Sequence, residues 1–422
     1  MARKKSDMQN SDKRNLSMQN NSMQNSDKRN LSMQNSDKQN FSKQNSSKQD
    51  GILLYSSLIW DNIWSHSHEL TSLLSKKSHI YYLEVPKNSA KGHEQLIAKK
   101  HNPLPKNVTL LTPKKTFNSF GLKYFAYTQA QTIKYFLKYN DKFDIFITYN
   151  TYDIALLNLA RLYNKKIIFM YVDEYEELTP NRFFKNIIAK NVKSFLKKAD
   201  IVVCTAKILE KKASLYNDNV YYLPNAVKLS DFSSLRKDSK GKKKFIVGFV
   251  GALGSWVDVD MIVDAAKMLG DDPRFEFRII GSGASEQRLK SRISDERIKN
   301  IKMLGFMNRN VVLKKMLQFD IAIIPFKINK ITHSVSPVKL FEYWMTGNPV
   351  IATKTFEMSQ YKDHLLLVDD AEGLKDSIIR LSNDENLGKK LSSSGRKLVI
   401  EKYNWEKYQA IYGKIIDSLD RR

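Results

Sequence analysis

The sequence predicts an α/β protein in which two Rossmann-like domains each carry a doubly wound parallel sheet. Short apolar runs alternate with segments of helical periodicity, a pattern typical of parallel sheets. The alternation runs over residues 51–229, stops in a polar and strongly basic linker at 230–244, and restarts over 245–402. The 422 residues of the chain are enough for two such domains and for additional segments.

The first fifty residues differ in composition from the rest of the chain. A ten-residue unit at 8–17 recurs at 23–32 and, with two changes, at 33–42. This unit has almost no apolar side chains to bury, so residues 1–50 are predicted to form a disordered low-complexity tail. We assign no chemistry to this tail.

The first domain begins with a buried apolar run that follows Gly51. Each predicted strand is a short run of apolar residues, and each predicted helix is a longer segment with helical periodicity. Strands are expected at 52–55, 80–85, 108–111, 143–148, 166–171, 201–204 and 220–223, and helices within 60–74, 124–139, 152–163 and 186–198.

The second domain repeats this pattern after the linker. Strands are expected at 245–250, 275–280, 301–304, 321–324 and 350–352, with helices between them. A basic helical segment follows at 391–419 and is interrupted near 403–405. We expect residues 403–422 to form a C-terminal helix that packs back on the first domain. In a fold of this kind, ligands bind beyond the carboxyl ends of the strands.

The segment 336–352 carries the most informative local signals of the chain. Ser336 is a typical N-cap residue, Pro337 a typical first helical residue and Gly347 a typical helix end. Ser336, Lys339 and Glu342 recur every three residues and therefore share one face of the helix. Free N–H groups at the helix start suit a phosphate, Lys339 adds a cation, and Glu342 offers a carboxylate to sugar hydroxyls. The alternative is an ordinary surface helix whose charged side chains lie in water.

This segment resembles the donor-binding helix of GT-B glycosyltransferases of group 1, or family 4, of the bacterial and archaeal type that builds surface polysaccharides. In that family a Pro-x-Lys-x-x-Glu-Tyr run precedes a Gly-x-Pro-Val turn, and this chain has Pro337, Lys339 and Glu342 at the matching positions. The resemblance extends, with gaps, from about Ile52 to the C-terminus. It implies that a nucleotide sugar binds to the second domain. Glu342 would then hold the ribose, and the helix start, Lys339 and the turn at Gly251 would hold the diphosphate.

Two glycine turns and a basic loop complete the donor site that the resemblance implies. The first turn follows the strand at 245–250, and the second follows the strand at 275–280. Glycines let the backbone approach a ligand closely, although a plain strand-to-helix turn is the alternative for both. The candidate residues are Gly251, Gly254, Gly281 and Gly283 in the turns and Lys327 and His333 in the loop.

The chain also departs from the pattern of the best-known retaining members. These carry a second Glu eight residues before the ribose-binding one, and position 334 is Ser here. The usual Arg and Lys after the first glycine turn are also absent. The comparison is still consistent with a ribose contact by Glu342, but it gives no support for contacts to the transferred sugar. Lys339 would take the place of the missing cations at the phosphates. A degenerate transferase that binds but does not react is therefore an alternative.

The acceptor and the reacting carbon are expected beyond the first strand of the first domain. An inverting transferase needs a base at the acceptor hydroxyl, and Asp61, His66 and Asp173 are the candidates. A structural role on the following helix is the alternative for His66. Asp258 and Asp260 resemble a metal-binding Asp-x-Asp pair, but Asp258 is better explained as a helix cap. We therefore expect no metal site.

The net charge of +26 limits the possible partners. Residues 1–50 hold 10 Lys and Arg and 5 Asp, a net of +5, which leaves +21 on the rest of the chain. Such a surface attracts nucleic acid, anionic lipid or phosphorylated ligands. The basic helical segments at 123–138 and 181–198 suit docking on an anionic membrane. The alternative is that their apolar faces pack into the core.

Several features bear on the compartment of the protein. Cys204 is the only cysteine and lies in an apolar run, so we expect a buried, inert thiol, and a reducing cytosol as its surroundings. No run reaches the roughly 18 apolar residues of a membrane span, and the N-terminus lacks the apolar region of a secretory signal. We expect a cytoplasmic protein, with docking on the inner face of the cell membrane as a further hypothesis.

Together these observations predict a glycosyltransferase that moves a sugar from a UDP- or GDP-linked donor to a surface-polysaccharide or lipid-linked glycan acceptor. No cofactor beyond the nucleotide sugar is expected, and the resemblance favours a retaining, metal-independent reaction. The nearest alternative is a sugar-nucleotide epimerase on the same fold. A basic nucleic-acid-binding protein is a further alternative, although the sequence shows no known nucleic-acid motif and no specific nucleic acid is expected as a partner.

Overall fold

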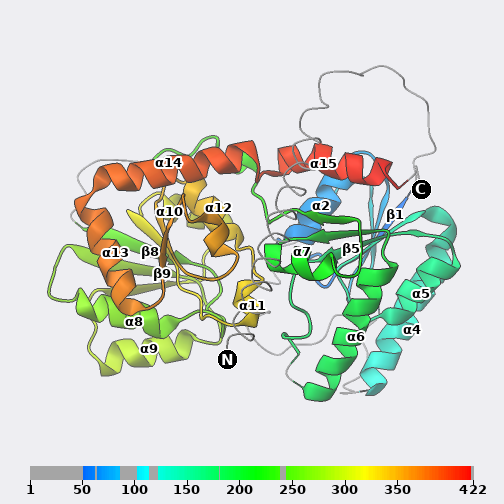
Figure 1. Cartoon of the computed structure of the whole chain (residues 1–422), viewed down its shortest axis with the longest axis horizontal. Coiled ribbons are helices and arrows are strands. Elements are labelled where there is room, and N and C mark those ends of the chain that lie inside the picture. Colours follow the sequence, from blue (N-terminus) through cyan, green and yellow to red (C-terminus); the bar gives the residue numbers. More distant parts are fainter. Residues whose placement is uncertain are drawn as a thin grey trace, which may run out of the picture. The chain divides into compact units, whose positions relative to one another are not determined.

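The computed structural model of the chain describes residues 51–61, 64–85, 102–113, 122–179, 181–237 and 244–419, with only the backbone for 122–126. The disordered tail predicted for residues 1–50 lies outside these ranges, as does part of the predicted linker. Within them, two parallel sheets with flanking helices are present, one in each half of the sequence. The predicted α/β class with two doubly wound sheets is confirmed (Figure 1).

Among the described residues, the first sheet has seven parallel strands in the order β3-β2-β1-β4-β5-β6-β7. Adjacent strands pair in parallel register throughout, for example Ile52 with Ile80 and with Ile145. The strands are β1 (Ile52–Tyr55), β2 (Ile80–Leu83), β3 (Val108–Leu111), β4 (Ile145–Thr148), β5 (Lys166–Tyr171), β6 (Ile201–Cys204) and β7 (Val220–Tyr222).

Each face of the first sheet has its own hydrophobic core, because successive side chains of a strand point to opposite faces. Leu53 and Phe146 belong to one core, and their neighbours Ile52 and Ile147 belong to the other. The first core also includes buried residues of α4 (Leu122–Tyr139), α5 (Ile154–Leu162), α6 (Arg182–Lys198) and α7 (Lys207–Ala213). The second core includes residues of α2 (His66–Leu74). Both faces of the sheet are therefore covered, as a parallel sheet requires.

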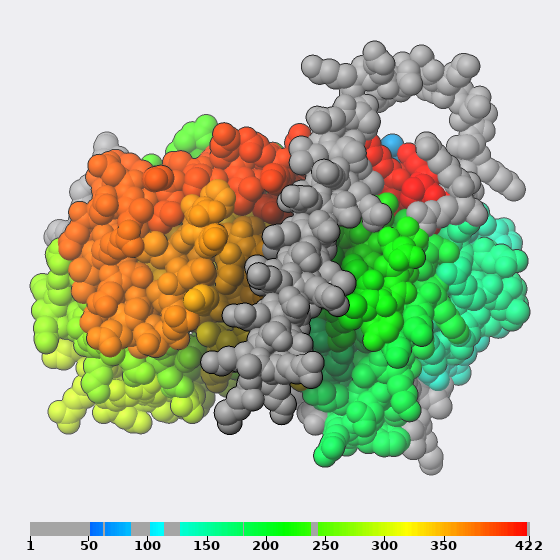
Figure 2. All heavy atoms as spheres, in the orientation of Figure 1, coloured from blue at the N-terminus to red at the C-terminus, as the bar shows by residue number. Residues whose placement is uncertain are grey.

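The second sheet has six parallel strands among the described residues, in the order β10-β9-β8-β11-β12-β13. The strands are β8 (Phe245–Val250), β9 (Phe275–Ile280), β10 (Ile301–Gly305), β11 (Ile321–Ile324), β12 (Val350–Thr353) and β13 (Leu366–Val368). The helices are α8 (Val259–Met268), α9 (Glu286–Asp295), α10 (Arg309–Met316), α11 (Lys330–His333), α12 (Val338–Met345), α13 (Ala371–Asn383) and α14 (Glu385–Glu401). In Figure 2 the last two form the orange surface of this half.

Most predicted elements match the structure, and the differences have local causes. Helix α6 begins at Arg182 rather than 186, because the Asn181 side chain accepts hydrogen bonds from two N–H groups of the first turn. Helix α8 begins at Val259 because Asp258 caps it in the same way. Strand β13 and helix α13 were not predicted from the sequence. The strand β13 is only three residues long, which is too short for a periodicity to be read.

The last helix, α15 (Trp405–Asp417), packs on the first sheet although it follows the second. Trp405, Tyr408 and Tyr412 are buried in the same core as Ile52 and the other residues of that face. The Trp405 indole N–H donates to the carbonyl of Ala226 at 3.1 Å. The chain therefore connects its two halves twice, once through the linker and once through the junction between α14 and α15.

Each sheet has one point at which the strand order reverses. In the first sheet this point lies between β1 and β4, and in the second between β8 and β11. At such a point the connections leave the two strands in opposite directions, which opens a crevice beyond their carboxyl ends. The residues just after β1, β4, β8 and β11 are therefore the positions at which to examine the predicted site.

Glu357, between β12 and the 3₁₀ turn Met358–Tyr361, connects the two halves although its side chain is fully buried. One carboxylate oxygen accepts the Lys207 backbone N–H at 2.9 Å, and the other accepts the Tyr222 hydroxyl at 2.7 Å. Burial raises the pKa of the Glu357 carboxyl to about 7, and these hydrogen bonds only partly oppose the shift. The contact between the halves thus contains a carboxyl that titrates near neutral pH.

The basic helix α6 is mainly a core helix. Ile188, Val192, Phe195 and Leu196 are buried against the first sheet, so the core-packing alternative is correct for these side chains. At its N-terminal end, however, Phe183 is 66% exposed. No helix in the described part of the chain has both the length and the apolar character of a membrane span.

Cys204 ends β6 and is fully buried, as expected from its apolar surroundings in the sequence. Burial raises the pKa of its thiol, so at neutral pH the group is a protonated, unreactive part of the core.

The pKa of Glu357 leads to a first prediction. Its folded-state pKa of about 7 lies above the ordinary value of 4.5, so folding takes up a proton between these pH values. The stability that this carboxyl contributes is therefore complete below about pH 4.5 and is lost as the pH rises to 7, by up to about 3 kcal/mol. Glu357→Gln stays neutral, so its thermal unfolding midpoint should rise relative to wild type between pH 5 and pH 8.

Glu385→Gln is the matched control, because this carboxylate is 81% exposed and forms an ion pair with Lys389 one turn along its helix. Its midpoint should differ from wild type by the same small amount at both pH values. If the unfolding midpoint of Glu357→Gln also differs from wild type by the same amount at both pH values, the pKa of Glu357 does not lie near 7.

Candidate functional site

The predicted donor site lies at the reversal point of the second sheet. Strand β8 ends at Val250 and continues into Gly251, and β11 ends at Ile324 and continues into Pro325. The two loops are tied together by backbone hydrogen bonds, from Asp258 N–H to the Pro325 carbonyl at 2.8 Å and from Lys327 N–H to the Trp256 carbonyl at 2.9 Å. The reversal point is therefore framed by two mutually supported loops.

The two glycine turns pack directly against each other. Gly251 has a φ of 138° and Gly281 a φ of 139°, a region that L side chains rarely adopt. A Cβ on Gly281 would lie 1.9 Å from the carbonyl oxygen of Gly251, so no larger residue fits there. Leu253 N–H also donates to the carbonyl of Ser282 at 2.9 Å. The second turn therefore supports the first.

The other two candidate glycines also have packing reasons to be glycine. A Cβ on Gly283 would lie 2.6 Å from the carbonyl oxygen of Leu253, and one on Gly254 would lie 2.5 Å from the Trp256 ring. For Gly254, Gly281 and Gly283 the close approach is thus made by the protein itself. Their contact with a donor stays a prediction.

The capping prediction for Ser336 is wrong by one residue. Helix α12 begins at Val338 with Pro337 as its N-cap. The Ser336 hydroxyl instead accepts the Asn225 backbone N–H at 3.2 Å, and the Asn225 side-chain amide donates to the Ser336 carbonyl at 2.6 Å. Asn225 belongs to the first half of the chain, so these two hydrogen bonds make Ser336 part of the contact between the halves. The start of α12 still follows directly, and its first N–H groups point away from the helix.

Lys339 lies over the first glycine turn. Its ammonium is 4.4 Å from the centre of the Phe249 ring and 5.5 Å from that of Phe326. A Cβ on Gly251 would lie 2.4 Å from the Lys339 nitrogen, so the glycine makes room for the ammonium. Burial lowers the pKa of Lys339 to about 8, and the charge of Glu342 opposes this shift. A desolvated cation of this kind is stabilised by an anion, and in the described part of the chain no carboxylate forms an ion pair with it.

Glu342 is 6% exposed and is held by a residue that the sequence analysis did not identify. The Arg309 guanidinium donates to one Glu342 carboxylate oxygen at 2.5 Å. The neighbouring Tyr343 also has a role, because its hydroxyl accepts the Val250 N–H at 2.8 Å and fixes the end of β8 against α12. Helix α12 therefore holds Lys339, Glu342 and the start of the glycine turn in one arrangement.

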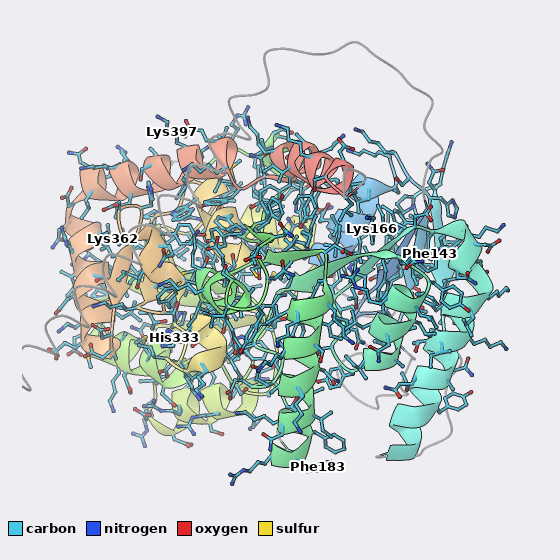
Figure 3. All side chains as sticks on the ribbon, turned by 45° about the vertical axis from the view of Figure 1, so that its right-hand side comes forward. Phe143, Lys166, Phe183, His333, Lys362 and Lys397 are labelled. Atoms are coloured by element: carbon cyan, nitrogen blue, oxygen red, sulfur yellow. The ribbon has the colours of Figure 1, made fainter. Side chains whose placement is uncertain are left out.

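The basic loop places its two candidates differently. His333 ends α11 (Figure 3), and its Nδ1 accepts the Phe356 backbone N–H at 2.9 Å. Because Nδ1 is the acceptor, the other nitrogen of the neutral ring carries the proton and is a donor. Lys327 is exposed. Ser334, at the position of the missing Glu, is buried and donates its hydroxyl to the Lys330 carbonyl at 2.7 Å.

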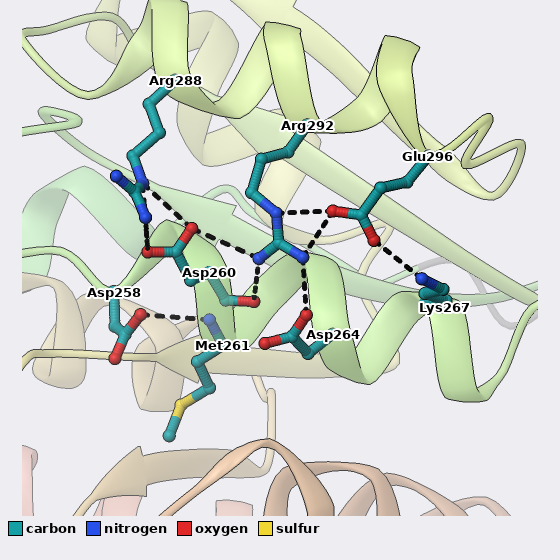
Figure 4. A network of polar contacts seen from close by, with 8 residues as sticks. All are labelled: Asp258, Asp260, Met261, Asp264, Lys267, Arg288, Arg292 and Glu296. Atoms are coloured by element: carbon teal, nitrogen blue, oxygen red, sulfur yellow. Dashed lines mark hydrogen bonds and ion pairs between the residues drawn. The ribbon is translucent and has the colours of Figure 1, made fainter.

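The Asp-x-Asp pair is occupied by protein contacts (Figure 4). Asp258 accepts the Met261 N–H at 3.0 Å and caps α8, which confirms the capping interpretation. Asp260 forms ion pairs with Arg288 at 2.8 Å and with Arg292 at 3.2 Å. These arginines already balance the charge of the second carboxylate.

Of the first-half candidates, Asp61 and His66 lie beyond the strands of the reversal point, and Asp173 lies beyond the adjacent strand β5. Asp61 follows β1 and accepts the Asn102 backbone N–H at 3.3 Å. His66 opens α2, and its Nδ1 lies 2.8 Å from the Tyr149 hydroxyl just after β4. Asp173 follows β5, whereas its neighbour Glu174 pairs with Lys212. The reversal point thus brings His66 to Tyr149.

The pKa values distinguish two of these candidates. Burial lowers the pKa of His66 to about 4, which makes the ring a poor proton acceptor at neutral pH. Its ring also packs at 5.0 Å from that of Trp405, so the structural alternative is the better explanation of His66. Burial raises the pKa of Asp173 to about 6, close to the value that suits a general base. By chemistry, Asp173 is the stronger candidate.

The chain is similar in sequence to known proteins. Residues 231–398 match the sequence model of the family described as "Glycosyl transferases group 1". A Bacillus subtilis protein described as "Putative teichuronic acid biosynthesis glycosyltransferase TuaH" is 25% identical over 182 residues, which cover 41% of this chain and 45% of that protein. The chain thus matches less than half the length of this curated relative.

Solved structures are similar over nearly the whole chain. Sucrose-phosphate synthase of Thermosynechococcus elongatus has a TM-score of 0.70 and 15% identity, covering 88% of this chain and 99% of that one. The HepE protein of Anabaena in complex with UDP-glucose has a TM-score of 0.62 and 14% identity, covering 87% and 99%. At such identities the likeness concerns the fold, which is the GT-B fold of two Rossmann-like domains.

Proposed function

We propose that this chain, whose residues 231–398 match the group 1 family of glycosyl transferases, transfers a sugar from a nucleotide-sugar donor to a surface-polysaccharide or lipid-linked glycan acceptor. The observation that carries this proposal is the partly buried ammonium of Lys339, which lies over the Gly251 turn and one helical turn before Glu342. Free N–H groups at the helix start and the Lys339 cation suit a diphosphate, and the Glu342 carboxylate suits the ribose of the same ligand.

The nucleoside diphosphate would bind at the reversal point of the second sheet. Its phosphates would accept hydrogen bonds from Lys339 and from the first N–H groups of α12, and the ribose hydroxyls would donate to Glu342. His333, through its protonated ring nitrogen, and Lys327 are further phosphate ligands of this proposal. The Anabaena protein of similar fold is described in complex with UDP-glucose, which supports a UDP-linked donor, with a GDP-linked donor as the second choice.

In the reaction, the bond between the anomeric carbon and the diphosphate breaks, and a bond to the acceptor oxygen forms. Lys339 and the helix start would stabilise the negative charge that develops on the departing diphosphate. The proton of the acceptor hydroxyl would go to Asp173, whose pKa burial raises to about 6, in an inverting reaction, and to the departing diphosphate in a retaining one. We favour retention of configuration, from the family resemblance. We also favour a reaction without a bound metal, because Asp258 caps a helix and Asp260 is paired with two arginines.

The acceptor is proposed from the curated relative. TuaH is named for teichuronic acid biosynthesis, and this supports a cell-surface glycan as the acceptor of the present chain. A lipid-linked acceptor of this kind would lie at a membrane, so we propose that the first half docks on an anionic membrane surface from the cytoplasmic side. The docking element would be the N-terminal end of α6, where Phe183 is 66% exposed and Leu178 is 47% exposed (Figure 3). Lysines on the exposed side of α6 would add electrostatic attraction.

The donor site leads to a prediction for Lys339→Met. Saturation of wild type with the correct nucleotide, UDP or GDP, at about 100 times its dissociation constant should raise the unfolding free energy by about 2.7 kcal/mol. Lys339→Met should weaken binding about 10- to 100-fold, because one charge-assisted hydrogen bond is lost. Wild-type affinity should also fall as the pH rises through about 8, where Lys339 loses its charge. Titration calorimetry measures both effects.

Lys330→Met is the matched control, because this lysine lies on the adjacent α11 and its side chain is 81% exposed. It should leave the affinity and its pH dependence unchanged. If wild type binds neither nucleotide nor their glucose conjugates, the proposed donor site is wrong.

The docking element leads to a prediction for Phe183→Ser. Inserting a phenylalanine side chain into the membrane interface contributes about 1.5–3 kcal/mol, so the change should lower partitioning onto phosphatidylglycerol vesicles about tenfold or more. Leu215→Ser is the control, because Leu215 is 76% exposed on the same half but away from α6 in sequence. Cosedimentation at low and high salt measures the partitioning. Equal loss in both variants, or no binding by wild type, would exclude α6 as the docking element.

A further inference from the structure

Arg309 connects Glu342 to the segment that joins the two halves of the chain. It is the first residue of α10, and its guanidinium donates to Glu342 at 2.5 Å and to Asp231 at 3.1 Å. Asp231 lies in the 3₁₀ turn Leu229–Phe232, just before the second domain begins. The side chains of Glu342, Arg309 and Asp231 therefore form a continuous series of ion pairs. This series lies outside the glycine turns and the basic loop.

The pairing uses only part of the hydrogen-bonding capacity of Glu342. Arg309 contacts one carboxylate oxygen, and among the described residues the second oxygen accepts no hydrogen bond. An ionised carboxylate offers about four acceptor positions. Both hydroxyls of a ribose can therefore be accepted while the contact with Arg309 is kept.

Without Arg309, a second cation would compete for the carboxylate. Lys339 precedes Glu342 by three residues on α12, a spacing at which side chains of a helix meet. A glutamate has three rotatable bonds, so an untethered Glu342 can turn toward Lys339 and form an ion pair with it. That pair would withdraw the carboxylate from a ribose and the ammonium from a phosphate. Arg309 keeps the two opposite charges of the site apart.

We propose that Arg309 is a positioning residue, tethered by Asp231, that holds the Glu342 carboxylate in place for the ribose hydroxyls of a nucleoside diphosphate. This inference rests on the proposed function and adds to it the recognition of ribose as opposed to deoxyribose. Arg309 does not act on the reacting atoms. Its effect reaches the ligand through Glu342.

The test compares the binding of ribo- and 2′-deoxyribonucleotides. UDP and 2′-deoxy-UDP, and likewise GDP and 2′-deoxy-GDP, are titrated into the full chain, and the ratio of their dissociation constants is measured. Wild type should prefer the ribonucleotide about tenfold or more, because a hydrogen bond to a charged carboxylate is lost in the deoxy compound. Arg309→Gln should reduce this ratio toward one, and Arg309→Lys should restore it in part.

Two further variants distinguish positioning from a general loss of structure. Asp231→Asn removes only the tether and should reduce the ratio by less than Arg309→Gln. Arg288→Gln is the matched control, because this arginine is 64% exposed on α9 and pairs with Asp260. Its ratio should equal that of wild type. In Glu342→Gln, the additional change Arg309→Gln should have no effect on the ratio, since the two residues act as a unit.

The possible results separate this inference from the proposed function. If wild type binds neither nucleotide, the donor site and the inference both fail. If wild type binds ribo- and deoxyribonucleotides equally, Glu342 does not recognise the ribose and the inference is overturned. If Arg309→Gln and Asp231→Asn weaken both nucleotides equally and keep the wild-type ratio, the donor site stands but Arg309 has no positioning role.

Discussion

The desolvated ammonium of Lys339 is the constraint on which the rest of the donor half depends. The ammonium lies over the rings of Phe249 and Phe326, and the desolvation of such a cation is unfavourable unless an anion accompanies it. The absence of a Cβ on Gly251 makes room for the ammonium, and the second glycine turn packs against Gly251. Tyr343 fixes the end of β8 to the same helix, so the turn and the cation keep one spacing.

The two halves are joined by polar contacts, and two of these contacts involve buried side chains of the second half. Glu357 and Ser336 both come from the donor half, and each binds backbone or hydroxyl groups of the first half. Ser336 directly precedes the helix that carries Lys339, so the contact between the halves and the proposed phosphate site share one segment. The packing of α15 on the first sheet adds an apolar connection that does not involve the site.

Features encoded within a few residues could be predicted from the sequence, and features made by distant residues could not. The strands at 52–55, 166–171, 245–250, 275–280 and 321–324 were predicted with their observed bounds, because a buried parallel strand is a short apolar run between polar ends. Ser336 was assigned as a cap because the rule is local, whereas its true partner Asn225 is 111 residues away. Arg309 could not be found, since nothing near Glu342 in the sequence indicates a partner 33 residues earlier. The roles of Asp61, His66 and Asp173 depend on burial, which the sequence does not give.

We propose that the second half of the chain presents a nucleotide sugar for transfer to a glycan acceptor. To test this, a donor labelled in its sugar, UDP-glucose or GDP-glucose, is incubated with the protein and with a bacterial membrane lipid extract as acceptor. We expect that label enters the lipid fraction, that nucleoside diphosphate is released in equal amount, and that both need the extract. Conversion of the donor to an epimer in the absence of the extract, or binding without any release of nucleoside diphosphate, would contradict it.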